Sequence, residues 1–249
     1  EVLDILPNNH AGITKQCDAT TATNGLKPPC ISTDPPYYDN IGYADLSDFF
    51  YVWLRRSLSK VYPNLFSTLL VPKTQELVAT PHRFGGNKEK ARKFFEEGLG
   101  QAFANMQETQ CSDYPLTVYY AFKQAEADEG EGENGNGSLA VTSTGWETML
   151  EGLIRAGFAV TGTGPIRSEL TTRNVGRGTN ALASSIVLVC RPRPEDARPA
   201  TRREFLAALK RELPEALRLL QHGNIAPVDL AQASIGPGMA IFSRYAQVL

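Results

Sequence analysis

Four consecutive residues, Asp34, Pro35, Pro36 and Tyr37, combine a carboxylate, a rigid backbone and an aromatic ring. A carboxylate accepts hydrogen bonds from an amino group, and two consecutive prolines fix φ, so the Pro35 carbonyl can be a second, immobile acceptor. Two such acceptors favour a tetrahedral nitrogen and direct its lone pair at an electrophile. The Tyr37 ring offers a face on which an extrahelical base can stack. These residues are therefore candidates for activating the exocyclic amino group of a nucleobase.

The residues before Asp34 predict a strand. The run from Cys30 to Thr33 is short, small and apolar, which is typical of a buried strand in a parallel sheet. Proline has no N–H for a strand ladder, so the chain should leave the sheet at Asp34. Ligands of open α/β sheets bind beyond the carboxyl ends of the strands, which is where Asp34 to Tyr37 would lie. The alternative is that Asp34 only forms a turn that ends the strand.

The tetrapeptide, placed after such a strand, resembles motif IV of the S-adenosylmethionine-dependent amino-methyltransferases of DNA, in the Asp form typical of N6-adenine enzymes. The longer segment STDPPYYDNIGYADLSDFF and the later residues 223–239 resemble a family of long adenine-specific DNA methylases, some of which carry a zinc ribbon. The resemblance implies methyl transfer from S-adenosylmethionine to N6 of adenine in DNA. It makes Asp34, Pro35, Pro36 and Tyr37 the catalytic residues.

Further site residues follow from this resemblance. Asp18 comes after a possible strand that begins at Ile13, and an acid there contacts the adenine of the cofactor in the methyltransferases. Asp18 and Asp34 are thus the candidate cofactor residues, although an Asp in a turn explains Asp18 equally well. The other candidates are polar or aromatic residues of two loops that would face the DNA. The first loop contains Tyr38, Asn40 and Tyr43. The second contains Arg167, Arg173 and Arg177, and it could equally be a surface loop without a function.

The glycine-rich turn that should bind the cofactor is not recognisable. Gly162-Thr-Gly164 follows a strand-like run but opens no helical pattern, and Gly236-Pro-Gly238 follows no clear strand. We therefore expect an incomplete, C-terminal half of a class I, Rossmann-like methyltransferase domain. The cofactor motif would lie in the remainder of the parent polypeptide, and the absence of an initial Met agrees with a fragment.

The expected fold is α/β, a mostly parallel sheet with helices on both faces and a last strand antiparallel to its neighbours. Residues 1–195 would form the catalytic part, and residues 196–249 a helical extension packed on it. The helix expected over 45–60 has one apolar face, which should pack on the sheet. The remaining elements are strands near 30–34, 116–122, 158–163 and 185–191, and helices over 87–107, 144–156 and from 201 onward.

Composition narrows the class further. The net charge is −2, so any DNA contact must come from local clusters such as His82, Arg83, Lys88, Lys90, Arg92 and Lys93, which could equally form a helix face with Lys–Glu pairs. The four cysteines lack C-x-x-C spacing, which predicts no zinc ribbon and no metal site. Cys30 and Cys190 should be core thiols of a cytoplasmic protein, since no signal peptide or membrane span is recognisable.

The sequence is also compatible with other functions. The acceptor could be N4 of cytosine, a base in RNA or a protein amide, because all present a similarly delocalised nitrogen. A non-catalytic nucleic-acid-binding domain of a larger defence-type protein is the alternative outside the enzymes.

Overall fold

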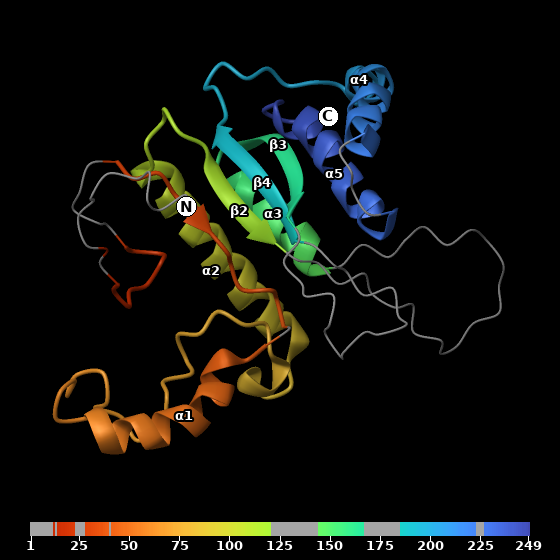
Figure 1. The fold of residues 1–249 in the computed structure, drawn as a ribbon. Coiled ribbons are helices and arrows are strands. Elements are labelled where there is room, and N and C mark those ends of the chain that lie inside the picture. The colour runs from red at the N-terminus through yellow and green to blue at the C-terminus, as the bar shows by residue number, and fades with distance from the viewer. Residues whose placement is uncertain are drawn as a thin grey trace, which may run out of the picture.

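The computed structural model describes residues 12, 14–22, 28–39, 41–120, 144–166, 185–222 and 227–249, without the side chains of 144, 165, 221, 222 and 227–234. It is an α/β structure with a four-stranded mixed sheet and five α-helices (Figure 1). The strands are β1 (Ser32–Thr33), β2 (Leu116–Tyr120), β3 (Phe158–Ile166) and β4 (Ser185–Pro192). The helices are α1 (Tyr43–Leu58), α2 (Lys88–Thr109), α3 (Thr144–Arg155), α4 (Arg202–His222) and α5 (Pro227–Ser243).

The strand order is β1-β2-β4-β3, with β4 inserted between two strands that run in the same direction. β1 pairs parallel to β2, with Ser32 opposite Thr117, whereas β4 pairs antiparallel to both β2 and β3. The four strand positions and the antiparallel last strand are therefore confirmed. The expectation of a mostly parallel sheet is wrong for the described pairs, because inserting β4 makes two of these three pairs antiparallel.

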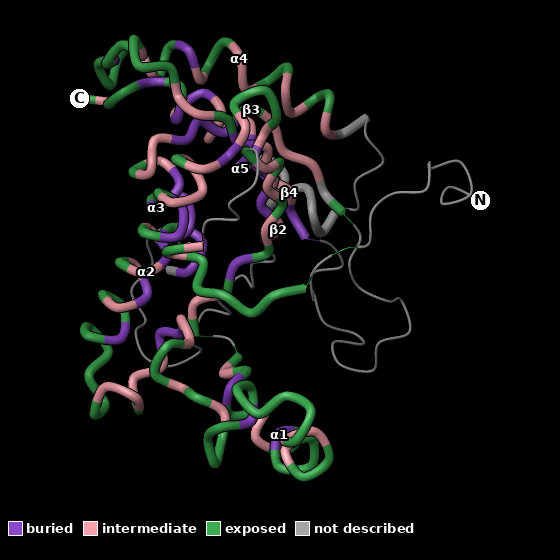
Figure 2. Tube along the Cα trace, turned by 90° about the vertical axis from the view of Figure 1, so that its left-hand side faces the viewer, coloured by how far each residue is buried: buried purple, intermediate pink, exposed green. Residues whose placement is uncertain are grey.

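The core lies between one face of the sheet and the layer formed by α2 and α3 (Figures 1 and 2). Strand β2 alternates buried and half-buried residues, so every second side chain enters this core. The predicted helices over 87–107 and 144–156 are confirmed as α2 and α3, whose apolar stripes face the strands. The largest fully buried side chains here are Trp146, Phe95, Phe103, Phe158 and Leu116.

The opposite face of the sheet is less covered. Tyr119 of β2 and Val187 and Val189 of β4 point away from α2 and α3 and are only half-buried, whereas Ser185 at the start of β4 is buried. Helix α5 lies instead along the edge strand β3 (Figure 1). The expectation of helices on both faces is therefore not met over β2 and β4 in the described part of the chain.

Helices α4 and α5 form the helical C-terminal region expected after residue 196. Helix α4 begins with a capping box, since Thr201 N donates to Glu204 Oε2 at 2.8 Å and Glu204 N donates to Thr201 Oγ1 at 3.2 Å. Helix α4 then continues through Pro214. Helix α5 is held against β3 by a buried hydrogen bond of 2.8 Å from Val160 N to Ser243 Oγ.

Gly236 lets α5 approach β3 closely, because a Cβ at this position would overlap the Thr163 side chain, whereas a Cβ at Gly238 would have nothing within 4 Å. We expect Gly236→Ala to destabilise the protein by about 1–2 kcal/mol, since overpacking costs about 1–3 kcal/mol and removing a helical glycine returns about 0.5–1 kcal/mol. The matched Gly238→Ala should be neutral or stabilising. Chemical denaturation of both variants checks this, and equal midpoints would contradict the packing.

Two sequence expectations about burial are resolved in opposite ways. Cys190 is a core thiol in β4 as predicted, and burial raises its pKa to about 12. Cys30 is exposed, so its assignment to the core is wrong. Cys30 lies just before β1, a strand of only two residues at the edge of the sheet, where no described element covers it.

Helix α1 also departs from expectation. It was expected to pack on the sheet, yet it projects from the body of the molecule and leaves most of its large apolar side chains exposed (Figures 1 and 2). Its anchor is polar: Glu76 Oε1 accepts a hydrogen bond from Ala44 N at 2.9 Å, and Arg83 pairs with both Asp45 and Glu76 at 2.7 Å. None of the helices in the described ranges combines the length and apolarity needed to cross a membrane.

Candidate functional site

The motif residues lie at the carboxyl end of β1, as predicted, beside the ends of two other elements. The Tyr37 ring packs edge-on against Tyr120, the last residue of β2, with centroids 4.8 Å apart and an interplanar angle of 67°. Tyr120 in turn contacts Trp146, in the first turn of α3, at 5.6 Å. Aromatic rings from the loop after β1, from β2 and from α3 therefore form one continuous row that begins at the motif.

Asp34 and Tyr37 are joined directly. Tyr37 Oη donates a hydrogen bond of 2.8 Å to Asp34 Oδ1, and the Asp34 residue is exposed while Tyr37 is half-buried. Among the described residues, Tyr37 is the one hydrogen-bond partner that the structure gives the Asp34 carboxylate. Its second oxygen, Oδ2, can therefore accept a hydrogen bond from an incoming amino group without breaking the first.

The two prolines have different surroundings. Pro35 is buried and Pro36 is exposed. A buried, ring-locked residue between the strand and the tyrosines holds the backbone of the motif in place. The Pro35 carbonyl precedes a second proline, which restricts its orientation, and its role as the second acceptor stays a prediction.

Tyr38 anchors the turn that follows the motif. It has a φ of +46°, in the left-handed region that non-glycine residues rarely adopt, and its carbonyl accepts a hydrogen bond of 2.9 Å from Ala79 N. Its ring packs on Phe95 of α2 at 5.2 Å, and burial, followed by the nearby Asp39 carboxylate, raises the pKa of its hydroxyl. The contacts observed for Tyr38 are structural, and its predicted role in substrate binding stays a prediction.

Gly145 and Tyr120 complete the wall of the site, and neither was predicted as a site residue. A Cβ at Gly145 would come within 2.9 Å of both Tyr120 Oη and Tyr38 Cβ, so a glycine is needed for this approach. Burial raises the pKa of Tyr120 to about 12, which keeps the hydroxyl protonated at neutral pH. The position of Tyr120 at the end of the strand next to β1 is the sequence signal that could have found it.

Of the other predicted substrate residues the structure describes Tyr43, and no contact links it to this group. Tyr43 is the first residue of α1 and is 62% exposed. Asn40 and the three arginines of the 167–177 loop, Arg167, Arg173 and Arg177, lie outside the described residues. Their predicted contacts with substrate stay predictions.

Asp18 forms a turn, as in the alternative to a cofactor contact. Its Oδ1 accepts hydrogen bonds from Thr20 N at 2.9 Å and from Thr20 Oγ1 at 2.8 Å, which lower the pKa of the exposed carboxyl. No strand precedes it within residues 14–22. Asn105 Nδ2 holds this segment through Ala19 O at 2.9 Å. Asn105 lies about 15 Å along α2 from Phe95, where Tyr38 packs, so Asp18 is held away from the motif.

The basic cluster is largely paired with acids. Arg83 binds Asp45 and Glu76 and is a structural anchor of α1. Arg92 pairs with Glu89 at 2.6 Å, and Lys93 pairs with Glu97 at 3.7 Å. These contacts match the alternative of a solvated helix face with Lys–Glu pairs, and phosphate binding by the cluster stays a prediction.

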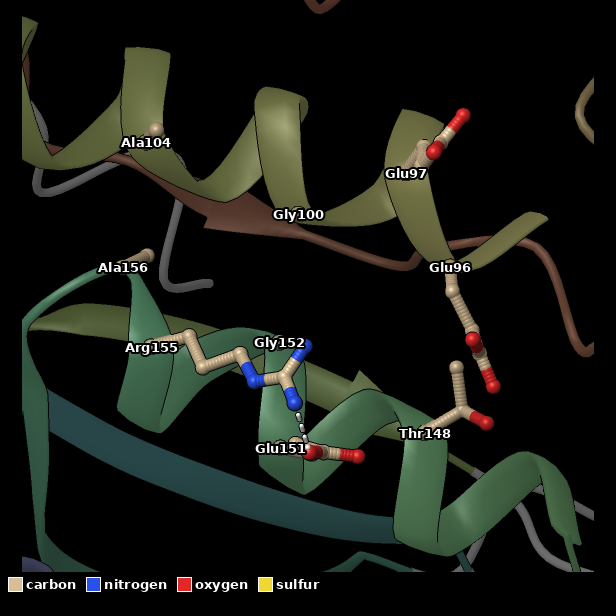
Figure 3. A pocket seen from close by; sticks show the side chains of 9 residues that line it. All are labelled: Glu96, Glu97, Gly100, Ala104, Thr148, Glu151, Gly152, Arg155 and Ala156. Carbon is tan, nitrogen blue, oxygen red and sulfur yellow. Dashed lines mark ion pairs between the residues drawn. The ribbon is translucent and has the colours of Figure 1, made fainter. Parts of the chain in front are cut away.

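A groove of about 280 Å³ separates α2 and α3, and it is distinct from the motif (Figure 3). Its floor contains the small residues Gly100 and Gly152, and Glu151 and Arg155 form an ion pair of 2.5 Å on its rim. Carboxylates predominate over cations in its lining, which is unfavourable for phosphate groups. Among the described residues, no group of His, Cys, Asp and Glu side chains is arranged to hold a metal ion.

The site is therefore defined by the geometry of this chain alone: an exposed carboxylate bonded to a tyrosine at the end of a strand, backed by aromatic rings. No family model matches the chain, and no curated protein or solved structure shows significant similarity to it.

Proposed function

We propose that this chain supplies the acceptor side of an S-adenosylmethionine-dependent methyltransferase that acts on N6 of adenine in DNA. The observation that carries the proposal is the pair formed by Asp34 and Tyr37 at the carboxyl end of β1. A carboxylate oxygen that can accept from an amino group lies beside an aromatic ring that can stack on a base. The pairing matches the role that the resemblance assigns to these residues.

The topology supports the same proposal. β1, β2 and β3 run in one direction, and β4 is the antiparallel strand between β2 and β3. The methyltransferase fold that the motif resembles ends in such an antiparallel pair of strands. In that fold the strand before the motif pairs with a neighbouring parallel strand. Here this neighbour is β2, which ends at Tyr120.

The residues would act by positioning and electrostatics. The adenine amino group donates one hydrogen bond to Asp34 Oδ2 and one to the Pro35 carbonyl, while the Tyr37 ring stacks on the base. Tyr37 Oη keeps Asp34 Oδ1 occupied, which orients the carboxylate before the base arrives. As the nitrogen acquires positive charge, the carboxylate stabilises it without reorganisation.

The described residues do not fit a complete site for S-adenosylmethionine. The Asp18 carboxylate is engaged in its own turn, and β1 is followed by the motif itself rather than by a glycine-rich turn. The residues directly after β2 and β3 lie outside the described ranges. The cofactor-binding half is therefore proposed to come from the remainder of the parent polypeptide. In the described part of the chain, the unpaired edge of β1 and the half-buried face of β2 and β4 are the surfaces that such a half could cover.

We expect this chain alone to bind S-adenosylmethionine weakly or not at all, since its sequence contains no recognisable glycine-rich motif for the turn that approaches the methionine moiety. Isothermal titration calorimetry on the 249-residue chain checks this. A dissociation constant in the low micromolar range would show that this chain holds a complete cofactor site. It would contradict the proposal that the cofactor-binding half comes from the remainder of the parent polypeptide.

Methyl transfer itself is tested with the full-length parent protein, DNA and labelled cofactor, followed by mass spectrometry of the nucleosides. N6-methyladenine is the expected product. N4-methylcytosine, or label in RNA or in a protein amide, would identify a different acceptor. The proposed role of Asp34 in binding the amino group would then still hold. DNA binding without any transfer would favour the non-catalytic nucleic-acid-binding domain instead.

A further inference from the structure

Helix α1 has an apolar face that no described residue covers (Figures 1 and 2). Six of its large apolar side chains are between 47% and 68% exposed, although soluble proteins seldom leave so many together on one element. The residues of this face, called here the α1 face, are Tyr43, Leu46, Phe49, Phe50, Trp53 and Leu54.

The orientation of the α1 face is fixed by contacts on the other side of the helix. Tyr51 is buried, packs on Phe66 at 5.4 Å, and its hydroxyl donates to the Thr68 carbonyl at 3.1 Å. Asp48 accepts from Lys73 Nζ at 2.6 Å. The segment after α1 therefore returns along the polar side of the helix and holds the α1 face outward.

The spacing on this face is that of a helix-pairing seam. Tyr43, Leu46, Phe50 and Trp53 are separated by three, four and three residues, the repeat that places side chains in the seam of two packed helices. Phe49 and Leu54 flank them. Six side chains exposed to this degree present on the order of 700 Å² of apolar surface. Each partner of a standard stable interface contributes about 800 Å², so the face is large enough for one.

The charges at the two ends of α1 favour an antiparallel orientation of two paired α1 helices. Asp45 lies in the first turn and is 43% exposed; it shares Arg83 with Glu76, so two carboxylates and one guanidinium leave this end acidic. Arg55 and Arg56 lie in the last turn. In an antiparallel pair of two identical helices, the acidic end of each faces the basic end of the other, and the helix dipoles oppose each other. A parallel pair would bring like charges together.

We propose that α1 pairs with α1 of a second copy of this chain, antiparallel and related by a two-fold axis near Phe50. Leu46 of each copy then faces Trp53 of the other, and Asp45 faces Arg56. The arrangement is isologous, as closed dimers of identical chains require. It goes beyond the proposed function and does not depend on it.

The oligomeric state is measured by sedimentation velocity from low micromolar concentration to the limit of solubility. The wild-type chain should be a dimer, and the double variant Phe50→Asp/Trp53→Asp should be a monomer with an unchanged circular dichroism spectrum. Leu219→Asp is the matched control, because Leu219 is a 70% exposed leucine on α4, and it should remain a dimer. A monomeric wild type, or a dimer that persists in the double variant, would overturn the proposal.

Cross-linking tests the orientation independently of stability. In a background with Cys17, Cys30 and Cys111 replaced by serine, a mixture of Leu46→Cys and Trp53→Cys chains is oxidised. The antiparallel pair predicts a disulfide-linked dimer in the mixture and little in either protein alone, since a disulfide requires Cα atoms within about 7 Å. Efficient self-linking of Leu46→Cys, or no linking in the mixture, would show that the helices do not pair in this way.

Discussion

Asp34→Ala should lower methyl transfer by the full-length parent protein by about a hundredfold or more, because one preorganised acceptor at a centre of developing charge typically contributes that much. The protein should stay folded. Asp34 is exposed, and among the described residues its carboxylate bonds to Tyr37 alone. Losing one exposed hydrogen bond costs about 1 kcal/mol of stability or less.

The measurement is single-turnover methyl transfer together with thermal melting and DNA binding. Asp39→Ala is the matched control, because it removes an exposed carboxylate from the same loop, and it should transfer the methyl group at close to the wild-type rate. A well-folded Asp34→Ala protein with near-wild-type transfer would exclude the proposed role of the carboxylate. A lower melting temperature, with activity falling only in proportion to the folded fraction, would identify Asp34 as a turn residue.

Tyr37→Ala should lower both base binding and transfer, because stacking of a base on an aromatic ring contributes about 1–3 kcal/mol. The variant also loses the hydrogen bond that orients Asp34 and the ring contact with Tyr120. The expected loss of transfer is therefore between about tenfold and a hundredfold.

Conservative variants separate the ring from the hydroxyl. Tyr37→Phe keeps the stacking face and loses the hydrogen bond to Asp34, so transfer should fall by at most about tenfold. Tyr37→Trp should likewise retain much of the activity. Fluorescence of 2-aminopurine at the target position reports base extrusion directly. If Tyr37→Phe were as impaired as Tyr37→Ala, the hydroxyl rather than the ring face would carry the effect.

Local patterns in the sequence determined much of the architecture. Asp34-Pro35-Pro36 ends β1 because proline cannot continue a strand, and the alternation in β2 reflects a sheet with one face in the core. The stripes of α2 and α3 and the capping box at Thr201 were equally readable, since each depends on residues within a few positions of one another.

Tertiary contacts decided what covers each apolar surface. The pattern of α1 shows that one side is apolar, but the same pattern suits a core and an interface between chains. Glu76 and Arg83, about thirty to forty residues away, turn α1 outward. The exposure of Cys30 has a similar origin, because a short apolar run predicts a strand but not whether a neighbour lies on it.

The site shows the same division. The sequence by itself determined that Asp34 and Tyr37 lie together at a strand end, because only two rigid prolines lie between them. Only the tertiary structure brought Tyr120, Gly145 and Trp146 to that point, since β2 and α3 reach it from positions about eighty to a hundred and ten residues away. It also held Asp18 at the far part of α2. Chain connectivity over a few residues limits conformation directly, whereas contacts across the fold depend on how whole elements pack.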